Sequence, residues 1–548
     1  MIAYLILMAI IVFALAYRFY GRFMNRAMGI DDRRATPAVT VNDGLDYCPA
    51  KRPLLFGHHF ASIAGAGLII GPIMAGRTFG WGPALLWIVI GAVFIGGVQD
   101  FTSLVASIRH RAQSVAQIAQ EYMSPMAHKL FLVFIWLALI YMIIVFADLT
   151  SATFVTGPGV GTISIAYTIL AVSLGIAVSL YRVGLLKGSL VVVPLLFLCL
   201  WWGGAHPFNP PIFLNSLQDT WDVLLMIYCF MASILPVWFL LQPRDYLSSF
   251  LLFACLAGGM IGILGGGWAG TLVIEIPFLR TLYDPQIGFI FPGLFIVLAC
   301  GACSGFHSIV ASGTTAKQLS EESQARCIGY GAMLVEGLLA CMALATVMIM
   351  MPLTGEETPT QIFAIGISRF FHFFGIPRDF SMMFGLLTLS TFLLTTLDTG
   401  TRLGRYAFSE LLGLKGRCGM IGATLATLIL PTYCLLNESA GPNGIVVPAW
   451  KMIWPVFGAS NQLLGALALL VVTVWLKKTG RPYVFTLIPT FFMISVTLVA
   501  LVQLIVKYQW SLIGVIAGAL LVLALVLGVE ALRAFSKGRR EGLENNLI

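Results

Sequence analysis

The chain has 548 residues, of which 59% are hydrophobic and only 10% are charged; this composition excludes a soluble domain and predicts a polytopic membrane protein. The formal net charge of +8 does not indicate nucleic-acid binding, because the basic residues are distributed as a membrane-topology signal. Ten cysteines lie singly, mostly in apolar stretches, so neither a disulfide framework nor a metal site is expected.

Apolar spans follow one another along almost the whole chain. Each is about 17–25 residues long, the length needed to cross a bilayer. We expect an all-α fold with about 15 such helices (14–16). The first span, which begins at Ile2, lacks the basic start and the cleavage site of a signal peptide, so we expect it to be retained. The spans start near residues 2, 55, 83, 129, 163, 188, 220, 246, 289, 327, 380, 418, 453, 484 and 511.

The connections between these spans differ in charge. When the connections are taken alternately, one set holds 26 of the 32 lysines and arginines and the other holds 6. Because basic loops stay in the cytoplasm, we expect the N-terminus outside and the C-terminal tail in the cytoplasm. The excess of basic residues is therefore explained by topology.

The span that begins near residue 55 is interrupted by small residues and carries histidine. Its sequence from Phe56 reads FGHHFASIAGAG and continues to Gly71-Pro72. Glycine at this density weakens a helix, and unwound backbone at membrane depth is tolerated only where protein or water satisfies it. We expect this segment to bind substrate through His58, His59, Ser62, Gly65 and Gly67.

A second interrupted span, from Cys300 to Thr315, has the same character. Its expected substrate-binding residues are Ser304, Gly305, His307, Ser308 and Ser312. Paired broken spans indicate a transporter's binding site, because free N–H groups suit an anion and free C=O groups suit a cation. Histidine adds a group that titrates near neutral pH. Close helix packing is the alternative explanation for the glycines and serines.

Six of the expected spans lie between the two broken segments, so the two segments run in opposite directions. This orientation predicts an inverted repeat of five plus five spans. The second half is regular, with five spans, whereas seven spans start in the first half. We expect an N-terminal helix and connection in 1–53, a first half with additional helices in 54–288, an inverted half in 289–476, and two accessory helices with a tail in 477–548.

Polar residues in two later spans are candidates for ion coupling. Glu336 lies in the middle of an apolar span, where a lone carboxylate is costly, and it is the best acidic proton-relay candidate. Thr395, Thr396, Asp398 and Thr399 offer hard oxygen ligands of the kind a small cation prefers. The alternative for this second group is an ordinary polar helix end, with Asp398 paired to Arg402.

Two further polar pairs receive a structural interpretation. Gln99-Asp100 is interpreted as a solvated helix end beside Arg109, and Arg244-Asp245 as a local ion pair. The chain contains no phosphate-binding glycine loop, zinc-protease motif or nucleophile elbow, so we expect neither an enzyme nor a cofactor.

Several motifs together resemble the carbon starvation protein A (CstA) family, and they extend over nearly the whole chain. They are FGHHFASIAGAG (56–67), VQDF (98–101), GACSGFHS (301–308), SGTTAKQ (312–318), GYGAM (329–333), TTLDTGTR (395–402) and SNQLL (460–464). The resemblance implies a LeuT-type inverted-repeat fold with discontinuous helices in the bacterial inner membrane. It also implies transport of peptides, or of pyruvate with protons, under carbon starvation.

We therefore expect a secondary active transporter that imports small carboxylates such as pyruvate, short peptides, or both, by alternating access with proton coupling. Few acidic residues lie within the spans, which favours a small anion, whereas the family description favours peptides. A sodium-coupled amino-acid-type symporter and a membrane nutrient sensor that binds the same ligands without flux are the alternatives. The sequence leaves the oligomeric state open.

Overall fold

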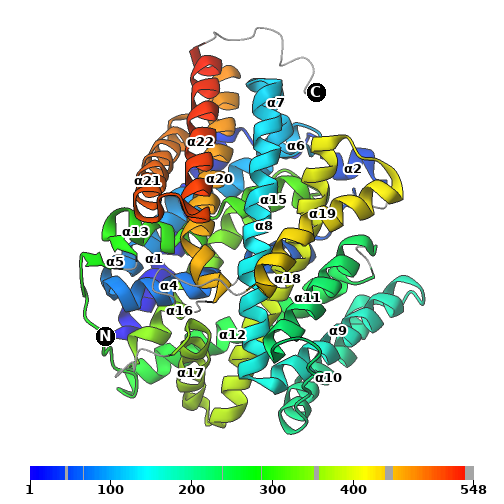
Figure 1. The fold of residues 1–548 in the computed structure, drawn as a ribbon, viewed down its shortest axis with the longest axis vertical. Helices are drawn as coiled ribbons and strands as arrows, with labels where there is room; N and C mark the ends of the chain where they lie inside the picture. The colour runs from blue at the N-terminus through cyan, green and yellow to red at the C-terminus, as the bar shows by residue number, and fades with distance from the viewer. Residues whose placement is uncertain are drawn as a thin grey trace.

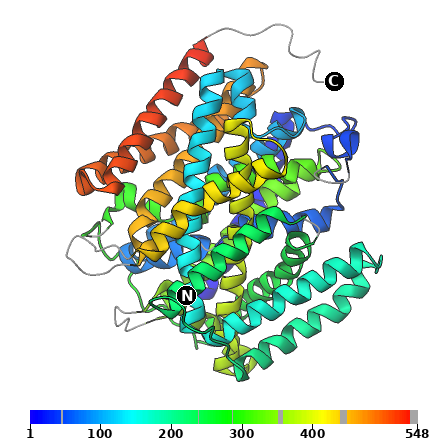
Figure 2. The same cartoon turned by 45° about the vertical axis from the view of Figure 1, so that its right-hand side comes forward.

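The structure is a computed structural model that describes residues 1–548 except 44–46, 66, 237–238, 286, 351–356, 438–447 and 537–548. Long helices dominate it, and two strands, β1 (Tyr283–Asp284) and β2 (Gly288–Phe289), form one short antiparallel pair. Figures 1 and 2 show the helices packed as one bundle, with α21 and α22 along one side and the α9–α10 hairpin at another edge.

Twelve helices in the described part of the chain are long and apolar enough to cross a membrane, and the bent pair α3/α4 brings the number to 13. Helix α11 (Leu217–Ile234) and the short helices α13 to α15 occupy the places of the other two expected spans, so the exact count of fifteen stays a prediction. The twelve spans are α1 (Ile2–Met28), α5–η1–α6 (Trp81–Gly91, Ala92–Gly96, Gly97–Arg109), α8 (Pro125–Thr156), α9 (Pro158–Ser179), α10 (Leu185–Ala205), α12 (Leu241–Trp268), η3–α16 (Arg326–Gly331, Ala332–Met348), α18 (Arg378–Leu412), α19 (Gly416–Leu436), α20 (Ala449–Lys478), α21 (Val484–Tyr508) and α22 (Leu512–Ser536).

Both segments expected to be broken are discontinuous. Helix α3 (Arg52–Ile63) ends before Gly65, and α4 (Gly67–Phe79) continues at an angle of 49°. The second segment consists of α13 (Ile290–Val297), α14 (Ala299–Ala302) and α15 (Gly305–Gly313). Cys303 and Ser304 have non-helical backbone angles between α14 and α15. The discontinuous helices predicted from the glycine-rich patterns are thus present.

Reciprocal helix contacts relate the two halves. The broken helix α3 packs against α12 in the first half, as α15 packs against α20 in the second. Helix α11 likewise packs against α18, and α19 packs against α8. The five spans of the first half are therefore α3–α4, α5–α6, α8, α11 and α12. The hairpin of α9 and α10 is an insertion that accounts for the two additional spans before residue 289. The domain boundaries given above stay a prediction.

A π-helical turn lies in the second span of each half, η1 in the first and η3 in the second. Each turn packs closely against a neighbour. A Cβ on Gly96 would lie 2.5 Å from the carbonyl oxygen of Ala302, and one on Gly329 would lie 2.9 Å from Cα of Phe101. Such wide turns are rare and often occur at functional sites. Both lie one turn before an acidic residue that reaches the site described below.

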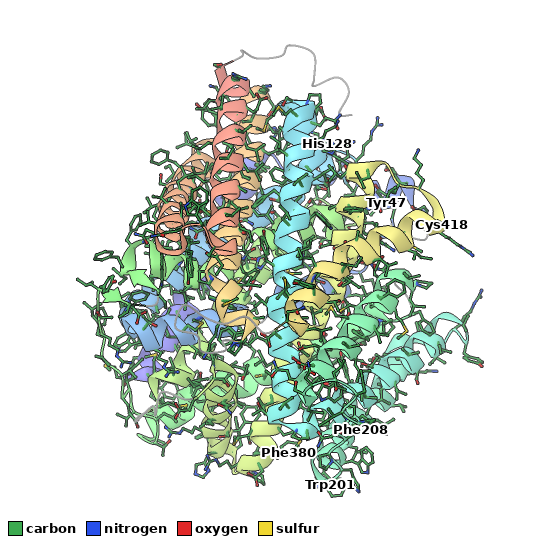
Figure 3. The ribbon with its side chains drawn as sticks, viewed as in Figure 1. Tyr47, His128, Trp201, Phe208, Phe380 and Cys418 are labelled. Atoms are coloured by element: carbon green, nitrogen blue, oxygen red, sulfur yellow. The ribbon has the colours of Figure 1, made fainter. Side chains whose placement is uncertain are left out.

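The two ends of the bundle carry different connections. Figure 3 shows His128, Tyr47 and Cys418 in its upper part and Trp201, Phe208 and Phe380 at its lower end. We call the end with His128, Tyr47 and Cys418 the basic end, because the basic connections of the sequence belong to it.

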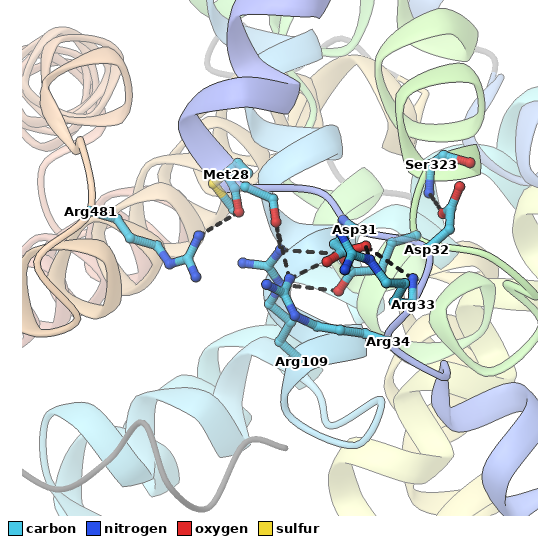
Figure 4. A network of polar contacts seen from close by, with 10 residues as sticks. Met28, Asp31, Asp32, Arg33, Arg34, Arg109, Ser323 and Arg481 are labelled. Carbon is cyan, nitrogen blue, oxygen red and sulfur yellow. Dashed lines mark hydrogen bonds and ion pairs between the residues drawn. The ribbon is translucent and has the colours of Figure 1, made fainter.

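The buried carboxylate of Glu322 links several segments at the basic end, and Figure 4 labels its partners Asp31, Arg34 and Arg109. Glu322, with 3% of its side chain exposed, accepts a hydrogen bond from Asp31 N at 3.0 Å and forms ion pairs with Arg34 at 3.3 Å and Arg109 at 3.1 Å. Arg109 Nη2 also donates to the carbonyl of Gly29 at 2.9 Å. The connection after α1 is thereby tied to the end of α6 and to the loop before η3.

Replacing Glu322 with alanine is expected to lower the free energy of unfolding by about 3 kcal/mol, because it leaves the nearly buried Arg109 without a carboxylate. Thermal unfolding in detergent measures this loss. The exposed neighbour Glu321, changed to alanine, is the matched control and should change stability little. Equal effects of the two variants would contradict the role assigned to Glu322.

Candidate functional site

The two helix breaks face a common cavity in the middle of the bundle. The central cavity is lined by Gly65 and Gly67 of the first break and by Ser304 and His307 of the second. Helix α8 supplies an apolar wall. The remaining polar lining comes from Cys300, Glu336, Thr396 and Asn461. A mainly apolar cavity with a few convergent polar groups is the usual form of a small-molecule site.

Glycine is required where the breaks approach other helices. A Cβ on Gly67 would lie 2.5 Å from the Cβ and Sγ atoms of Cys300. A Cβ on Gly305 would lie 2.3 Å from the carbonyl oxygen of Asn461, which is backbone and cannot rotate away. A Cβ on Gly65 would lie 3.2 Å from Thr396 Oγ1. The glycines that predicted the breaks thus also let the backbone meet α14, α18 and α20.

Replacing Gly305 with alanine is expected to reduce stability by about 1–3 kcal/mol, because its Cβ would overlap the backbone of α20. Thermal unfolding measures the loss. The matched control is Gly518→Ala on α22, where an added Cβ meets nothing within 4 Å. That change should be neutral or stabilising, since alanine favours helix over glycine. A Gly305 variant as stable as the control would show that the packing of α15 on α20 relaxes easily.

The start of α15 is fixed by amide side chains. Asn461 Oδ1 of α20 accepts from the backbone N–H of Phe306 at 3.1 Å, and Gln99 Nε2 of α6 donates to the carbonyl of Ser304 at 2.5 Å. The Ser304 hydroxyl lies 3.2 Å from Asn461 Oδ1. These bonds satisfy backbone groups that the break exposes at membrane depth.

His307 lies between two carboxyl groups. Its Nδ1 atom is 3.0 Å from Asp100 Oδ2, and its Nε2 atom is 3.4 Å from Glu336 Oε2. All three side chains are at most 1% exposed. A neutral imidazole donates from only one nitrogen, so it would turn a lone pair toward one of the carboxylates. Both contacts can be hydrogen bonds when the triad of His307, Asp100 and Glu336 holds one proton more than a neutral imidazole with two carboxylates. This proton lies on the ring or on one of the acids.

The two acids of the triad come from equivalent spans of the two halves. Asp100 follows η1 on α6, and Glu336 follows η3 on α16. The interpretation of Gln99-Asp100 as a solvated helix end is wrong, because α6 continues to Arg109 and Asp100 is fully buried. The mostly apolar residues Phe101 to Ile108, which follow Asp100, were the signal that the helix continues and buries this acid.

The other histidines of the first break point elsewhere. His59 Nδ1 lies 2.8 Å from Thr315 Oγ1, beyond the end of α15. His58 Nδ1 lies 3.4 Å from Asp245 Oδ2 of α12. His58 and Ser62 line a second cavity, toward the basic end. Among the ten expected substrate-binding residues, the central cavity is lined by Gly65, Gly67, Ser304 and His307.

The remaining expected substrate residues hold the local backbone. Ser62 Oγ donates to the carbonyl of His58 at 2.8 Å, and Ser308 Oγ donates to Gly305 at 2.7 Å. Ser312 Oγ donates to the carbonyl of Ser308 at 2.7 Å. These three hydroxyl donors are already used within their own helices in this conformation.

The four oxygen-bearing residues of α18 do not converge on one point. Thr396 lines the central cavity, whereas Thr399 lines the second cavity. Asp398 accepts from Tyr228 at 2.8 Å and forms a buried ion pair with Arg244. Thr395 is buried, and its hydroxyl has no hydrogen-bond partner among the described residues. A carboxylate that is paired with arginine has less charge to offer a cation.

Arg244 and Asp245 are adjacent in sequence but contact different helices. Arg244 contacts Asp398 of α18, whereas Asp245 contacts His58 of α3. The local pair expected from the sequence is therefore not formed. Arg402 donates to the carbonyls of Ala232 and Leu235 at 2.9 and 2.5 Å, in place of the expected pairing with Asp398.

Known proteins match this chain over most of its length. The peptide transporter CstA of Campylobacter jejuni is 33% identical, with 92% of this chain and 80% of the relative covered. The pyruvate/proton symporter BtsT of Escherichia coli is also 33% identical, with 93% and 81% covered. The family model for carbon starvation protein CstA matches residues 1–355 and 351–500.

A solved transporter has a similar fold. The crystal structure of MhsT in complex with L-phenylalanine aligns with a TM-score of 0.50 at 14% identity, covering 89% of this chain and 98% of that one. The expected LeuT-type architecture is confirmed, as is the expectation of a transporter and not an enzyme. With its broken helices and with these relatives along most of its length, the chain belongs to the carbon starvation protein CstA family.

Proposed function

We propose that this protein imports a small carboxylate, with pyruvate as the first candidate, by alternating access in symport with a proton. The observation that carries the proposal is the buried triad, in which both nitrogens of His307 face carboxyl oxygens. One relative is a pyruvate/proton symporter and another is a peptide transporter, so a short peptide is the second candidate cargo.

The central cavity is the proposed cargo site. Ser304, Asn461 and the start of α15 offer polar contacts to a carboxylate, and Phe306 and Phe457 form apolar walls. Of the described residues that line it, Glu336 is the one acid, and it faces His307. A peptide would need a carboxylate for its ammonium group, so this lining favours a small anion.

The triad is the proposed coupling site. It is shared by the break of the second half and by the second spans of both halves, and His307 lines the cargo cavity. Loss or gain of a proton there changes the charge beside the cargo by one unit. In a buried site this change alters cargo affinity strongly, which is what coupling requires.

Membrane orientation completes the proposal. We place the basic end in the cytoplasm and the N-terminus outside, following the distribution of lysine and arginine. Cargo then enters at the opposite end, passes the two breaks, and leaves at the basic end.

Sodium coupling is the second candidate. It would use oxygens near Thr396, which lies beside Gly65 at the first break, together with Thr395, Asp398 and Thr399. The ion pair of Asp398 with Arg244 weighs against it in this conformation.

Uptake into liposomes tests the proposal. Purified protein is reconstituted, and accumulation of labelled pyruvate and of a labelled dipeptide is measured under a proton gradient or a sodium gradient. We expect pyruvate accumulation that follows the proton gradient and collapses with a protonophore. Accumulation driven by a sodium gradient would assign ion coupling to the oxygens of Thr395, Thr396, Asp398 and Thr399 on α18 instead of to the triad. Binding of cargo without transport under either gradient would support the alternative function of a membrane nutrient sensor.

A further inference from the structure

A second cavity lies at the basic end and carries positive charge. Residues of α3, α12, α15 and α18 line this basic cavity. Its cationic lining residues are Lys317, just after α15, and Arg402 of α18. Among the described residues, Asp245 is the one acid in the lining, and it already faces His58.

Neither cation forms an ion pair with a carboxylate in the part of the chain that the structure describes. Within the described ranges, no acidic oxygen lies within 4 Å of Lys317 or Arg402. Lys317 rests over the ring of Tyr47 at 5.4 Å. Arg402 is 8% exposed, and its Nε atom is buried without a hydrogen-bond partner among the described residues. An unpaired charge in such a position is costly, and a bound anion would lower that cost.

The basic cavity continues the route from the central cavity. On α18, Thr396 lines the central cavity, and Thr399, about one turn later, lines the basic cavity. On α3 the neighbours Ile63 and Ser62 divide in the same way. The two cavities therefore lie in series along the same helices.

We propose that the basic cavity is a second binding site for the carboxylate of the cargo, occupied on the way out of the central cavity. This proposal rests on the proposed function. The ligand is a small monocarboxylate, or the C-terminal carboxylate of a peptide. Lys317 and Arg402 supply the charge, and the hydroxyls of Ser62, Thr314 and Thr399 lie in the same lining.

Binding stoichiometry tests the second site. Equilibrium dialysis of purified protein with labelled pyruvate, or with the labelled dipeptide if that is the compound taken up, should reveal two sites in the wild type. Lys317→Gln should weaken the second site about tenfold and leave the first unchanged, as expected for loss of one charge-assisted contact. Arg402→Gln should act in the same way.

The controls separate charge from folding. Lys415→Gln removes an exposed lysine outside the basic cavity and should leave both sites intact. Arg402 also donates to the last carbonyls of α11, so its variant is interpreted only if its melting temperature is unchanged. Lys317 makes no such hydrogen bond to α11 within the described part of the chain. In exchange assays with liposomes, the concentration of internal cargo needed for the same exchange rate should be about tenfold higher for Lys317→Gln than for the wild type.

The failures are distinguishable. A wild type that transports cargo but binds it at one site overturns the basic-cavity proposal and leaves the proposed function standing. Unchanged binding and exchange in Lys317→Gln overturn it as well. A wild type that takes up neither pyruvate nor the dipeptide overturns the proposed function, and the second site with it.

Discussion

Replacing His307 with alanine is expected to abolish proton-driven accumulation, so that cargo inside and outside the liposomes reaches equal concentration. The change removes the imidazole that contacts both Asp100 and Glu336 and leaves these two buried carboxyls without it. Both acids would then remain protonated through the cycle, because neither can bear its charge alone in a buried site. Cargo movement would no longer require a proton.

Two measurements make this prediction specific. Counterflow, which needs no net proton movement, should survive in the variant while accumulation is lost. The matched control is His128→Ala, because His128 also pairs with an acid, Glu410 at 2.8 Å, but lies at the basic end outside the site. A His307 variant that accumulates cargo with wild-type dependence on the proton gradient would exclude this residue from coupling.

Replacing Asp398 with leucine is expected to lower the free energy of unfolding by about 3–5 kcal/mol, because it leaves the fully buried Arg244 uncompensated. The Nε and Nη2 atoms of Arg244 have no other hydrogen-bond partner among the described residues. Thermal unfolding in detergent measures the loss. Asp379→Asn, at the exposed start of the same helix, is the matched control.

A second substitution distinguishes a structural pair from an ion site. The double variant Asp398→Leu with Arg244→Met should recover most of the lost stability, because a buried ion pair can be replaced by apolar residues at little cost. If Asp398→Asn is instead as stable as the wild type and loses a dependence on sodium, Asp398 is a coupling residue and the sodium alternative is favoured.

The helix breaks were predictable, because their cause is local. Glycine and serine in an apolar span weaken the helix wherever it occurs, and the charge of the connections gives the relative direction of distant spans. The inserted hairpin of α9 and α10 was not predictable in the same way, since apolar periodicity does not show which spans pack against which. The contacts between helices, such as those of α11 with α18 and of α19 with α8, identify the equivalent helices.

The site residues were harder to predict for a geometric reason. Residues 395, 396, 398 and 399 are close in sequence, but successive side chains of a helix point about 100° apart, so the group reaches two cavities and an arginine. The same rule separates His58 from His59. Asp100 was missed because sequence alone did not show how far its helix continues toward Arg109.

The π-helical turns η1 and η3 have a consequence for the evolution of the chain. Each added or deleted residue in a helix rotates everything after it by about 100°. Asp100 and Glu336 both lie just after such a turn, so the wide turns set the rotational phase at which each acid meets His307. Length changes there would turn both acids away together with their neighbours, whereas the inserted hairpin of α9 and α10, residues 158–205, shows that the connection after α8 accommodates an insertion without disturbing that phase.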